Sequence, residues 1–219
     1  MKVGTDGVLL GAWCTCENAA NALDIGTGTG LIALMLAQRN ANLKITAIEP
    51  NDSALKDAAP NFENAPWKDR IILHKADLQS FCDCSAKFDL IVSNPPFFKN
   101  SLNNPDADRS MARHIDDFSP DAFAKAAMKC LSPNGIIAGI YPLDSFKEFD
   151  LAAAEVGLLP LRLCGVRPTP EKPPHRMLFE YGFAERQTTF IEELIIEEKG
   201  RHGYSDAYKT LTGAFYLSF

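Results

Sequence analysis

The sequence lacks the apolar runs that membrane proteins need. No stretch of about 18 consecutive apolar residues occurs among its 219 residues. The opening residues, MKVGTDG, do not have the charged and then apolar pattern of a secretory signal. These absences argue against a membrane-spanning or secreted protein, and we expect a soluble cytoplasmic protein.

Cysteines with metal-binding or redox spacing are also missing. Cys14 and Cys16 are separated by one residue, as are Cys82 and Cys84, while Cys130 and Cys164 stand alone. Zinc knuckles and thioredoxin-like motifs use a two-residue spacing instead. Reduced cysteines in the core or on the surface explain this usage, and we expect no metal site.

Positive charge is scarce. The 22 Lys and Arg residues are outnumbered by 28 Asp and Glu residues, which gives a formal net charge of −6. This balance argues against a protein that coats nucleic acid non-specifically, although it leaves room for a local basic groove. A hydrophobic share of 46% with 23% charged residues fits one globular domain over residues 1–219.

Short apolar runs alternate with helix-like segments, and such runs are typical of parallel strands covered on both faces. We expect strands at 21–26, 44–49, 70–77, 88–94, 135–142, 158–168 and 175–185. Ser119 is a candidate helix cap before Pro120, and Pro60 predicts a kink or early stop in another helix. FIEELIIEE fits a strand or a helix, and SDAYKTLTGAFYL predicts a final helix. The order predicts a doubly wound α/β sheet, whose ligands bind beyond the carboxyl ends of the strands.

A glycine-rich loop follows the first expected strand. Glycines at alternate positions let the backbone turn tightly and approach a ligand, and the next helix offers unpaired N–H groups to an anionic end. The spacing is GxGxG, whereas nicotinamide and flavin sites use GxGxxG. The candidate cofactor residues of this loop are Asp24, Gly26, Thr27, Gly28 and Gly30.

Acidic residues stand at the ends of the next two expected strands. Glu49 suits ribose hydroxyls, with an ordinary solvated strand-end acid as the alternative. Asp77 closes the third strand, where its carboxylate suits the exocyclic amine of adenine and the Leu78 N–H suits a ring nitrogen. The alternative for Asp77 is a helix cap or turn. Together with the glycine loop, these residues favour a nucleoside site.

The motifs DIGTGTG, IEP and AD at successive strand ends resemble those of class I S-adenosylmethionine-dependent methyltransferases. The resemblance implies a Rossmann-like sheet of seven strands, mostly parallel with one antiparallel strand. It also implies that Glu49 binds the ribose, that Asp77 pairs with adenine, and that the helix after the glycine loop meets the methionine carboxylate. Thr5 and Asp6, in the opening loop, would help to fix the methionine end. A capped entry helix is the alternative for that loop.

The stretch SNPPFF ends the fourth expected strand, because proline donates no hydrogen bond to a sheet. An exocyclic amine becomes a better nucleophile when acceptors bind both of its protons. The side-chain oxygen of Asn94, which would point toward the cofactor's methyl group, and the carbonyl of Pro95 are the candidate acceptors. Pro95 and Pro96 restrict the backbone, and Phe97 could stack on a flipped-out base. A proline-stopped strand with core phenylalanines is the alternative.

Longer stretches resemble one narrower family over nearly the whole chain. KVGTDGVLLGAW, SNPPFF with RSMARH, HRMLFEY and YKTLTGAFYL are similar to the bacterial tRNA1(Val) adenine-37 N6-methyltransferase family. This resemblance implies methylation of adenine 37 in a tRNA anticodon loop by a protein that we expect to be a monomer. Because members carry residues before KVGTDG, we expect a short or missing N-terminal cap. The implied RNA contacts are Phe98, Arg109, Arg113, His114 and Arg176, with surface charge as the alternative for the basic residues.

Other functions remain open at this point. NPPF is shared by enzymes that methylate planar nitrogens, so an rRNA guanine-N2 methyltransferase and a protein glutamine N5-methyltransferase are alternatives. A cofactor-binding but inactive RNA or protein partner is a further alternative. A nicotinamide enzyme fits the glycine spacing least well.

Overall fold

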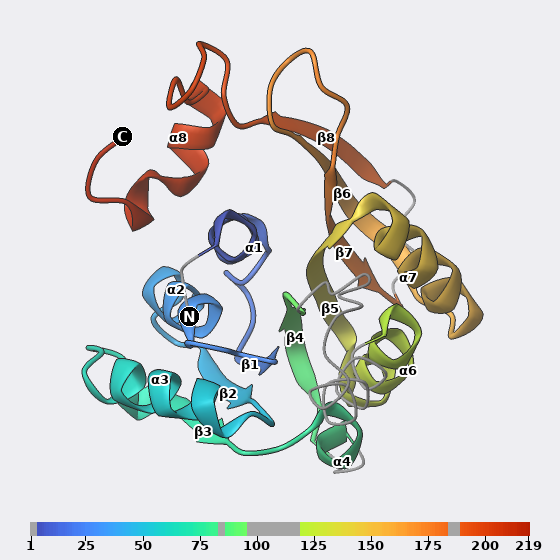
Figure 1. Cartoon of the computed structure of the whole chain (residues 1–219). Helices are drawn as coiled ribbons and strands as arrows, with labels where there is room; N and C mark the ends of the chain where they lie inside the picture. Colours follow the sequence, from blue (N-terminus) through green and yellow to red (C-terminus); the bar gives the residue numbers. More distant parts are fainter. Residues whose placement is uncertain (1–3, 83–85, 96–118, 184–188) are drawn as a thin grey trace, which may run out of the picture.

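The computed structural model describes residues 4–82, 86–95, 119–183 and 189–219, and Figure 1 shows its strands joined in one twisted sheet. The sheet has the order β3-β2-β1-β4-β5-β7-β6-β8. β7 is antiparallel to β5 and β6, and the other neighbouring strands pair in parallel. The strands are β1 (Asn21–Ile25), β2 (Lys44–Ile48), β3 (Ile71–His74), β4 (Phe88–Ser93), β5 (Leu131–Pro142), β6 (Leu159–Arg167), β7 (Arg176–Gly182) and β8 (Phe190–Ile195).

The expected doubly wound α/β class with one antiparallel strand is confirmed, with one strand more than expected. The eighth strand is β8, which pairs with β6 at the end of the sheet. It comes from FIEELIIEE, so the strand alternative for this segment is confirmed.

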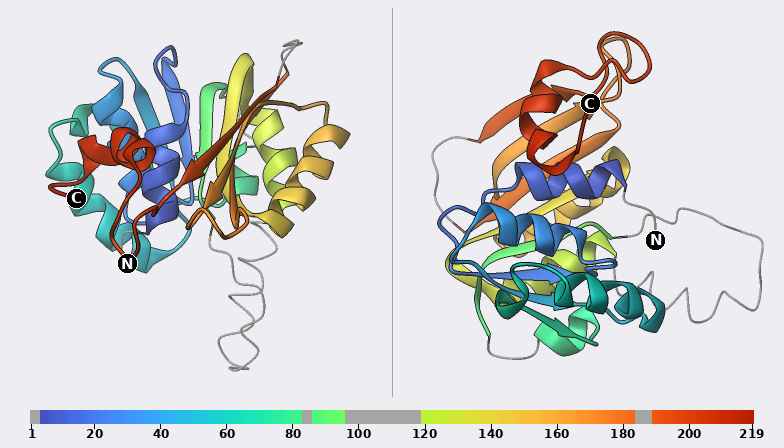
Figure 2. Two further views of the ribbon diagram at one scale, coloured as in Figure 1. Left: turned by 90° about the horizontal axis from the view of Figure 1, so that it is seen from above. Right: turned by 90° about the vertical axis from the view of Figure 1, so that its left-hand side faces the viewer.

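Helices cover both faces of the sheet. One buried cluster joins α1, α2, α3 and α8 to the first face, and a second joins α4, α6 and α7 to the other. Figure 2 shows α8 and the C-terminus on the same side as α1 and α2. The helices are α1 (Thr5–Trp13), α2 (Leu31–Arg39), α3 (Asp52–Glu63), α4 (Leu78–Cys82), α6 (Pro120–Cys130), α7 (Leu143–Glu155) and α8 (Asp206–Thr212), with 3-10 turns η1 (Lys68–Arg70) and η2 (Gly213–Phe215).

Local sequence explains how two of these helices begin and end. The Ser119 hydroxyl accepts a hydrogen bond from the Ala122 N–H at 3.1 Å, so the expected cap before Pro120 is confirmed. Of the kink or early stop expected at Pro60, the early stop is wrong, because α3 continues to Glu63. Pro60 removes one backbone bond in the last turn, and burial of Phe62 beyond it offsets this loss.

The strands that run in parallel place their carboxyl ends along one edge of the sheet. Residues that follow β1, β2, β3 and β4 therefore come together there, although they are far apart in the chain. None of the helices in the described ranges has the length and apolar character needed to cross a membrane.

Candidate functional site

The glycine loop between β1 and α2 has a backbone that requires glycine. Gly26, Gly28 and Gly30 have φ values of 66°, 58° and 84°, in the left-handed region that other residues rarely adopt. At Gly30 space also excludes a side chain, because an added Cβ would lie 2.3 Å from Cε1 of Phe62. The backbone conformation therefore requires glycine at these positions, and at Gly30 the packing of Phe62 requires it as well, while ligand approach to the loop stays a prediction.

Glu49 is held against this loop rather than pointing into solvent. Its side chain is buried, Oε2 accepts a hydrogen bond from the Gly28 N–H at 3.0 Å, and Oε1 accepts one from the Asn51 N–H at 3.0 Å. The alternative of an ordinary solvated acid is therefore wrong. The carboxylate stands where the ends of β1 and β2 meet.

Asp24 is a fully buried acid at the end of β1. Its Oδ2 accepts a hydrogen bond from the Thr27 hydroxyl at 2.6 Å, whereas its Oδ1 has no hydrogen-bond partner among the described residues. Burial, with a smaller contribution from the Glu49 carboxylate, raises the pKa of Asp24 to about 6. An unpaired buried acceptor is costly unless a ligand or another donor satisfies it.

Asp77 lies outside the strand that it was expected to close. β3 ends at His74, and Asp77 precedes α4, where its Oδ1 accepts a hydrogen bond from the Ser80 N–H at 2.7 Å. This bond holds the pKa of Asp77 below its ordinary value, and the cap alternative is confirmed. The following Leu78 has a fully buried side chain. The roles of Asp77 and Leu78 toward adenine stay predictions.

The end of β4 brings Asn94 to the glycine loop. Ser93 pairs in register with Ile25, and its buried hydroxyl donates to the Ile25 carbonyl at 3.0 Å. Asn94 is half-buried and Pro95 is buried. Within the described ranges the Asn94 side chain makes no hydrogen bond, so its oxygen is available as an acceptor. The other predicted residues of this segment lie outside the described residues: Pro96, Phe97, Phe98, Arg109, Arg113 and His114.

The first turn of α1 lies beside Asn94. An added Cβ at Gly7 would lie 3.6 Å from Nδ2 of Asn94 and 3.2 Å from Cδ2 of Leu31, the first residue of α2. The sequence did not single out Gly7 or Leu31, because nothing local marks a contact between distant segments. The structure thus brings the predicted turn, with Thr5 and Asp6, to the predicted catalytic asparagine.

Asp6 and Arg176 form an ion pair, although the sequence assigned them to different partners. Nε of Arg176 donates to Oδ2 of Asp6 at 2.8 Å, and both side chains are about three-quarters buried. Arg176 is therefore not a free surface charge. Its contact with RNA stays a prediction.

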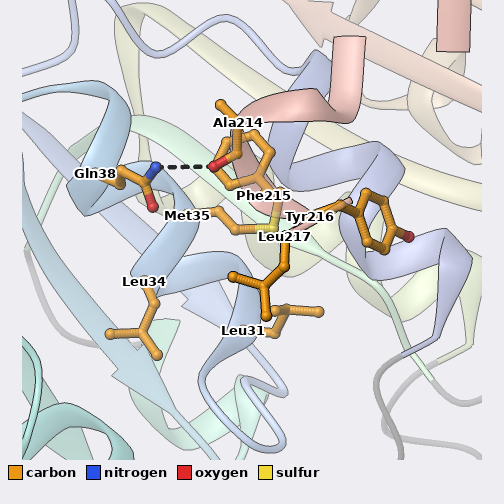
Figure 3. A pocket seen from close by; sticks show the side chains of 8 residues that line it. All are labelled: Leu31, Leu34, Met35, Gln38, Ala214, Phe215, Tyr216 and Leu217. Carbon is orange, nitrogen blue, oxygen red and sulfur yellow. Dashed lines mark hydrogen bonds between the residues drawn. The ribbon is translucent and has the colours of Figure 1, made fainter. Parts of the chain in front are cut away.

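A separate hollow of about 270 Å³ lies between α2 and the C-terminal segment (Figure 3). Gln38 donates to the Ala214 carbonyl across it at 3.2 Å. None of the predicted site residues that the structure describes lines this hollow. Its lining is Leu31, Leu34, Met35, Gln38, Ala214, Phe215, Tyr216 and Leu217.

The described part of the chain contains no group of three or more His, Cys, Asp or Glu side chains suited to a metal ion. Cys14, Cys16, Cys130 and Cys164 are buried and form no disulfides. Burial raises the pKa of the Cys16 thiol to about 11, which disfavours the thiolate that metals and electrophiles need.

Comparison with known proteins identifies the family. The family described as "Methyltransferase small domain" matches residues 7–138. The chain is 44% identical to the tRNA1(Val) (adenine(37)-N6)-methyltransferase of Bacteroides fragilis, over 99% of this chain and 91% of that protein. Proteins of the same name from Vibrio vulnificus and Trichodesmium erythraeum are 41% and 40% identical, with 99% and 100% of this chain and 89% and 92% of theirs covered. The chain belongs to this methyltransferase family.

Solved structures confirm the methyltransferase fold. A predicted O-methyltransferase from Agrobacterium tumefaciens superposes with a TM-score of 0.75 at 19% identity, covering 98% of each chain. A SAM-dependent O-methyltransferase from Thermotoga maritima gives a TM-score of 0.60 at 16% identity, covering 86% of this chain and 68% of that chain. At these identities the likeness concerns the fold alone.

S-adenosylmethionine is the cofactor of this methyltransferase, and the observed site fits it. The left-handed glycines form a tight turn directly before α2, whose first turn has no side-chain cap among the described residues. Glu49 is fixed at the tip of β2, where a carboxylate can accept from ribose hydroxyls, and Asp24 keeps an unpaired acceptor in the same region. A nucleoside with a zwitterionic amino-acid end can use all three features.

Proposed function

We propose that this methyltransferase transfers the methyl group of S-adenosylmethionine to N6 of adenine 37 in the anticodon loop of tRNA1(Val), in the cytoplasm and as a monomer. The position of Asn94 carries the proposal: it follows β4 at the carboxyl edge, beside the glycine loop and the first turn of α1. The match to relatives named for this reaction, over 99% of the chain, supports this substrate.

Asn94 and Pro95 act on the target amine. Its lone pair is delocalised into the adenine ring, so it is a weak nucleophile until both N–H protons have acceptors. Oδ1 of Asn94 and the carbonyl of Pro95 accept those protons and favour the attacking form of the nitrogen. The Ser93 hydroxyl, bonded to Ile25, fixes the strand end that presents both acceptors.

The other predicted site residues within the described ranges hold the cofactor. When bound, the cofactor supplies an electrophilic methyl group. Glu49 accepts from the ribose hydroxyls, and the N-terminus of α2 receives the methionine carboxylate. Asp77 and the Leu78 N–H bind adenine, while Thr5 and Asp6 hold the methionine end. We assign the glycine-loop residues to the same cofactor site: Asp24, Gly26, Thr27, Gly28 and Gly30.

The substrate base is bound by residues after Asn94. Pro96 stiffens the segment and Phe97 stacks on the flipped-out adenine. We assign RNA contacts to Phe98, Arg109, Arg113 and His114, because aromatic faces and cations suit bases and phosphates.

Asn94→Ala tests the catalytic assignment. We expect the methylation rate on tRNA to fall by about 100-fold or more, as when an oriented hydrogen-bonding group is lost from an active site. S-adenosylhomocysteine binding, measured by calorimetry, should change by less than about threefold, or about 0.65 kcal/mol. Substrate methylation at the wild-type rate by Asn94→Ala would show that the amine is activated elsewhere.

A further inference from the structure

The first turn of α1 lies across the carboxyl ends of several strands. Gly7 lies beside Asn94, which follows β4, and beside Leu31 at the start of α2, because an added Cβ at Gly7 would lie within 4 Å of both side chains. One residue earlier, Asp6 is bonded to Arg176, the first residue of β7. Arg176 pairs in register with Pro142, the last residue of β5. The ion pair therefore links the β5–β7 side of the sheet to the part of α1 that lies beside Asn94.

The geometry of this ion pair suits a fixed contact. The side chains of Arg176 and Asp6 are 27% and 26% exposed, so water and salt screen the pair less than they screen an ion pair on the open surface. The guanidinium is held a second time, because its Nη1 donates to the His175 carbonyl at 3.2 Å. Both contacts fix the orientation of the guanidinium toward α1.

The opposite end of α1 has its own anchors. Nη1 of Arg39 donates to the Gly11 carbonyl at 2.9 Å. Two residues beyond the helix, the N–H and hydroxyl of Thr15 donate to the buried Glu180. Loss of Arg176 would therefore release the first turn of α1 while its other end stays attached to the sheet.

We propose that Arg176 is a positioning residue, which holds the first turn of α1 against Asn94 and the methionine end of the cofactor through Asp6. In this role Arg176 acts on cofactor binding and on the chemical step, in place of the RNA contact that the sequence predicts for it. The inference rests on the proposed function, because it takes Asn94 as the catalytic group.

Calorimetry with S-adenosylhomocysteine, without RNA, tests the proposal. We expect Arg176→Ala to weaken binding by about tenfold, equivalent to about 1.4 kcal/mol. Arg176→Lys keeps a charge that can reach Asp6 and should recover most of that loss. Asp6→Asn should also weaken binding, and adding Arg176→Ala to it should cause little further loss, because residues that act through one contact are not additive.

Arg39→Ala is the matched control, since it removes an arginine that holds the far end of α1. It should lower the melting temperature while S-adenosylhomocysteine affinity stays within about twofold, or about 0.4 kcal/mol. Steady-state methylation separates the remaining roles: Arg176→Ala should lower kcat and leave the KM for tRNA unchanged.

Two outcomes would overturn the proposal. One is unchanged cofactor affinity in Arg176→Ala. The other is a raised KM for tRNA with a weaker salt dependence, which would mark Arg176 as a phosphate contact. Wild-type protein that binds S-adenosylhomocysteine but methylates another nucleotide contradicts the proposed function alone, since the binding comparison uses no RNA.

Discussion

Asp24 is a buried acid whose incomplete hydrogen bonding is typical of a residue at a ligand site. The residue lies in the core at the end of β1, yet within the described part of the chain only one of its two carboxylate oxygens is hydrogen-bonded, to Thr27. A purely structural position would favour an apolar residue or a fully paired one. The unpaired oxygen therefore carries a free-energy cost that a bound ligand can offset.

This cost predicts a pH-dependent effect of Asp24→Asn on stability. The pKa of Asp24 is raised from 3.8 to about 6 in the folded protein, so folding favours the protonated acid. Its contribution to the free energy of unfolding is fully present below pH 4 and is lost as the pH rises through 6. Asparagine cannot ionise, so the variant should gain about 2 kcal/mol relative to wild type between pH 4 and 7. Urea unfolding across this range measures the difference, and a difference that does not vary with pH contradicts the assignment.

Gly30 predicts a second effect at the level of one residue. Gly30→Ala meets both an unfavourable φ of 84° and the ring of Phe62, whereas Gly157→Ala meets an unfavourable φ of 79° in open space. Gly157→Ala should cost about 1 kcal/mol of unfolding free energy, and Gly30→Ala should cost about 2 to 4 kcal/mol. Chemical denaturation of both variants isolates the clash. Equal losses would show that Phe62 moves aside at no cost.

At the scale of elements, α1 is fastened to strands from the far end of the chain. Arg162 on β6 stacks on the Trp13 ring at 4.1 Å and donates to the Trp13 carbonyl. Its guanidinium also binds both carboxylate oxygens of Glu192 on β8, and the Trp13 indole N–H donates to the same carboxylate. Arginine is the residue that can make the two-point contact with a carboxylate, the hydrogen bond to a carbonyl and the stacking contact together.

Arg162→Lys should therefore destabilise the protein although it keeps the charge. Lysine loses the two-point contact with Glu192 and much of the stacking on Trp13, which should lower the unfolding free energy by about 1 to 2 kcal/mol. Arg201 is exposed and offers the control. Arg201→Lys should change the unfolding free energy by less than about 0.5 kcal/mol. The comparison uses urea unfolding. Equal changes in unfolding free energy for the two variants would mean that the contacts of Arg162 with Trp13 and Glu192 add no stability.

Most elements near the site were predictable from local sequence. Apolar runs predicted the parallel strands, and Ser119 before Pro120 predicted the start of α6. The glycine pattern predicted the tight loop with left-handed residues. β8 remained ambiguous because Phe190 and Ile191 are both exposed, so this edge strand lacks a clean alternation of buried and exposed residues.

Contacts between distant segments were not predictable. The Asp6–Arg176 pair joins residues that are 170 positions apart, and neither local sequence indicates which residue its partner is. Asp77 illustrates a different limit, because an aspartate before a short helix suits both a cap and a ligand-binding role. The sequence expectation placed it within a strand, whereas β3 ends at His74.

At the scale of the whole molecule, the sheet order brings the site together. β1 lies between β2 and β4, so the glycine loop has Glu49 on one side and Asn94 on the other. The strands β6, β7 and β8 extend the sheet and hold α1, whose first turn reaches the same edge. The C-terminal third of the chain therefore supports a site whose cofactor loop lies in the first third.

The most direct test is a nucleoside-resolved methylation assay on tRNA1(Val). Purified protein, labelled S-adenosylmethionine and the tRNA are incubated, and the digested nucleosides are separated by mass spectrometry, with a transcript lacking adenine 37 as the control. The account predicts N6-methyladenosine in the intact transcript and none in the control. Methylguanosine, label in protein, or equal labelling of both transcripts would contradict it.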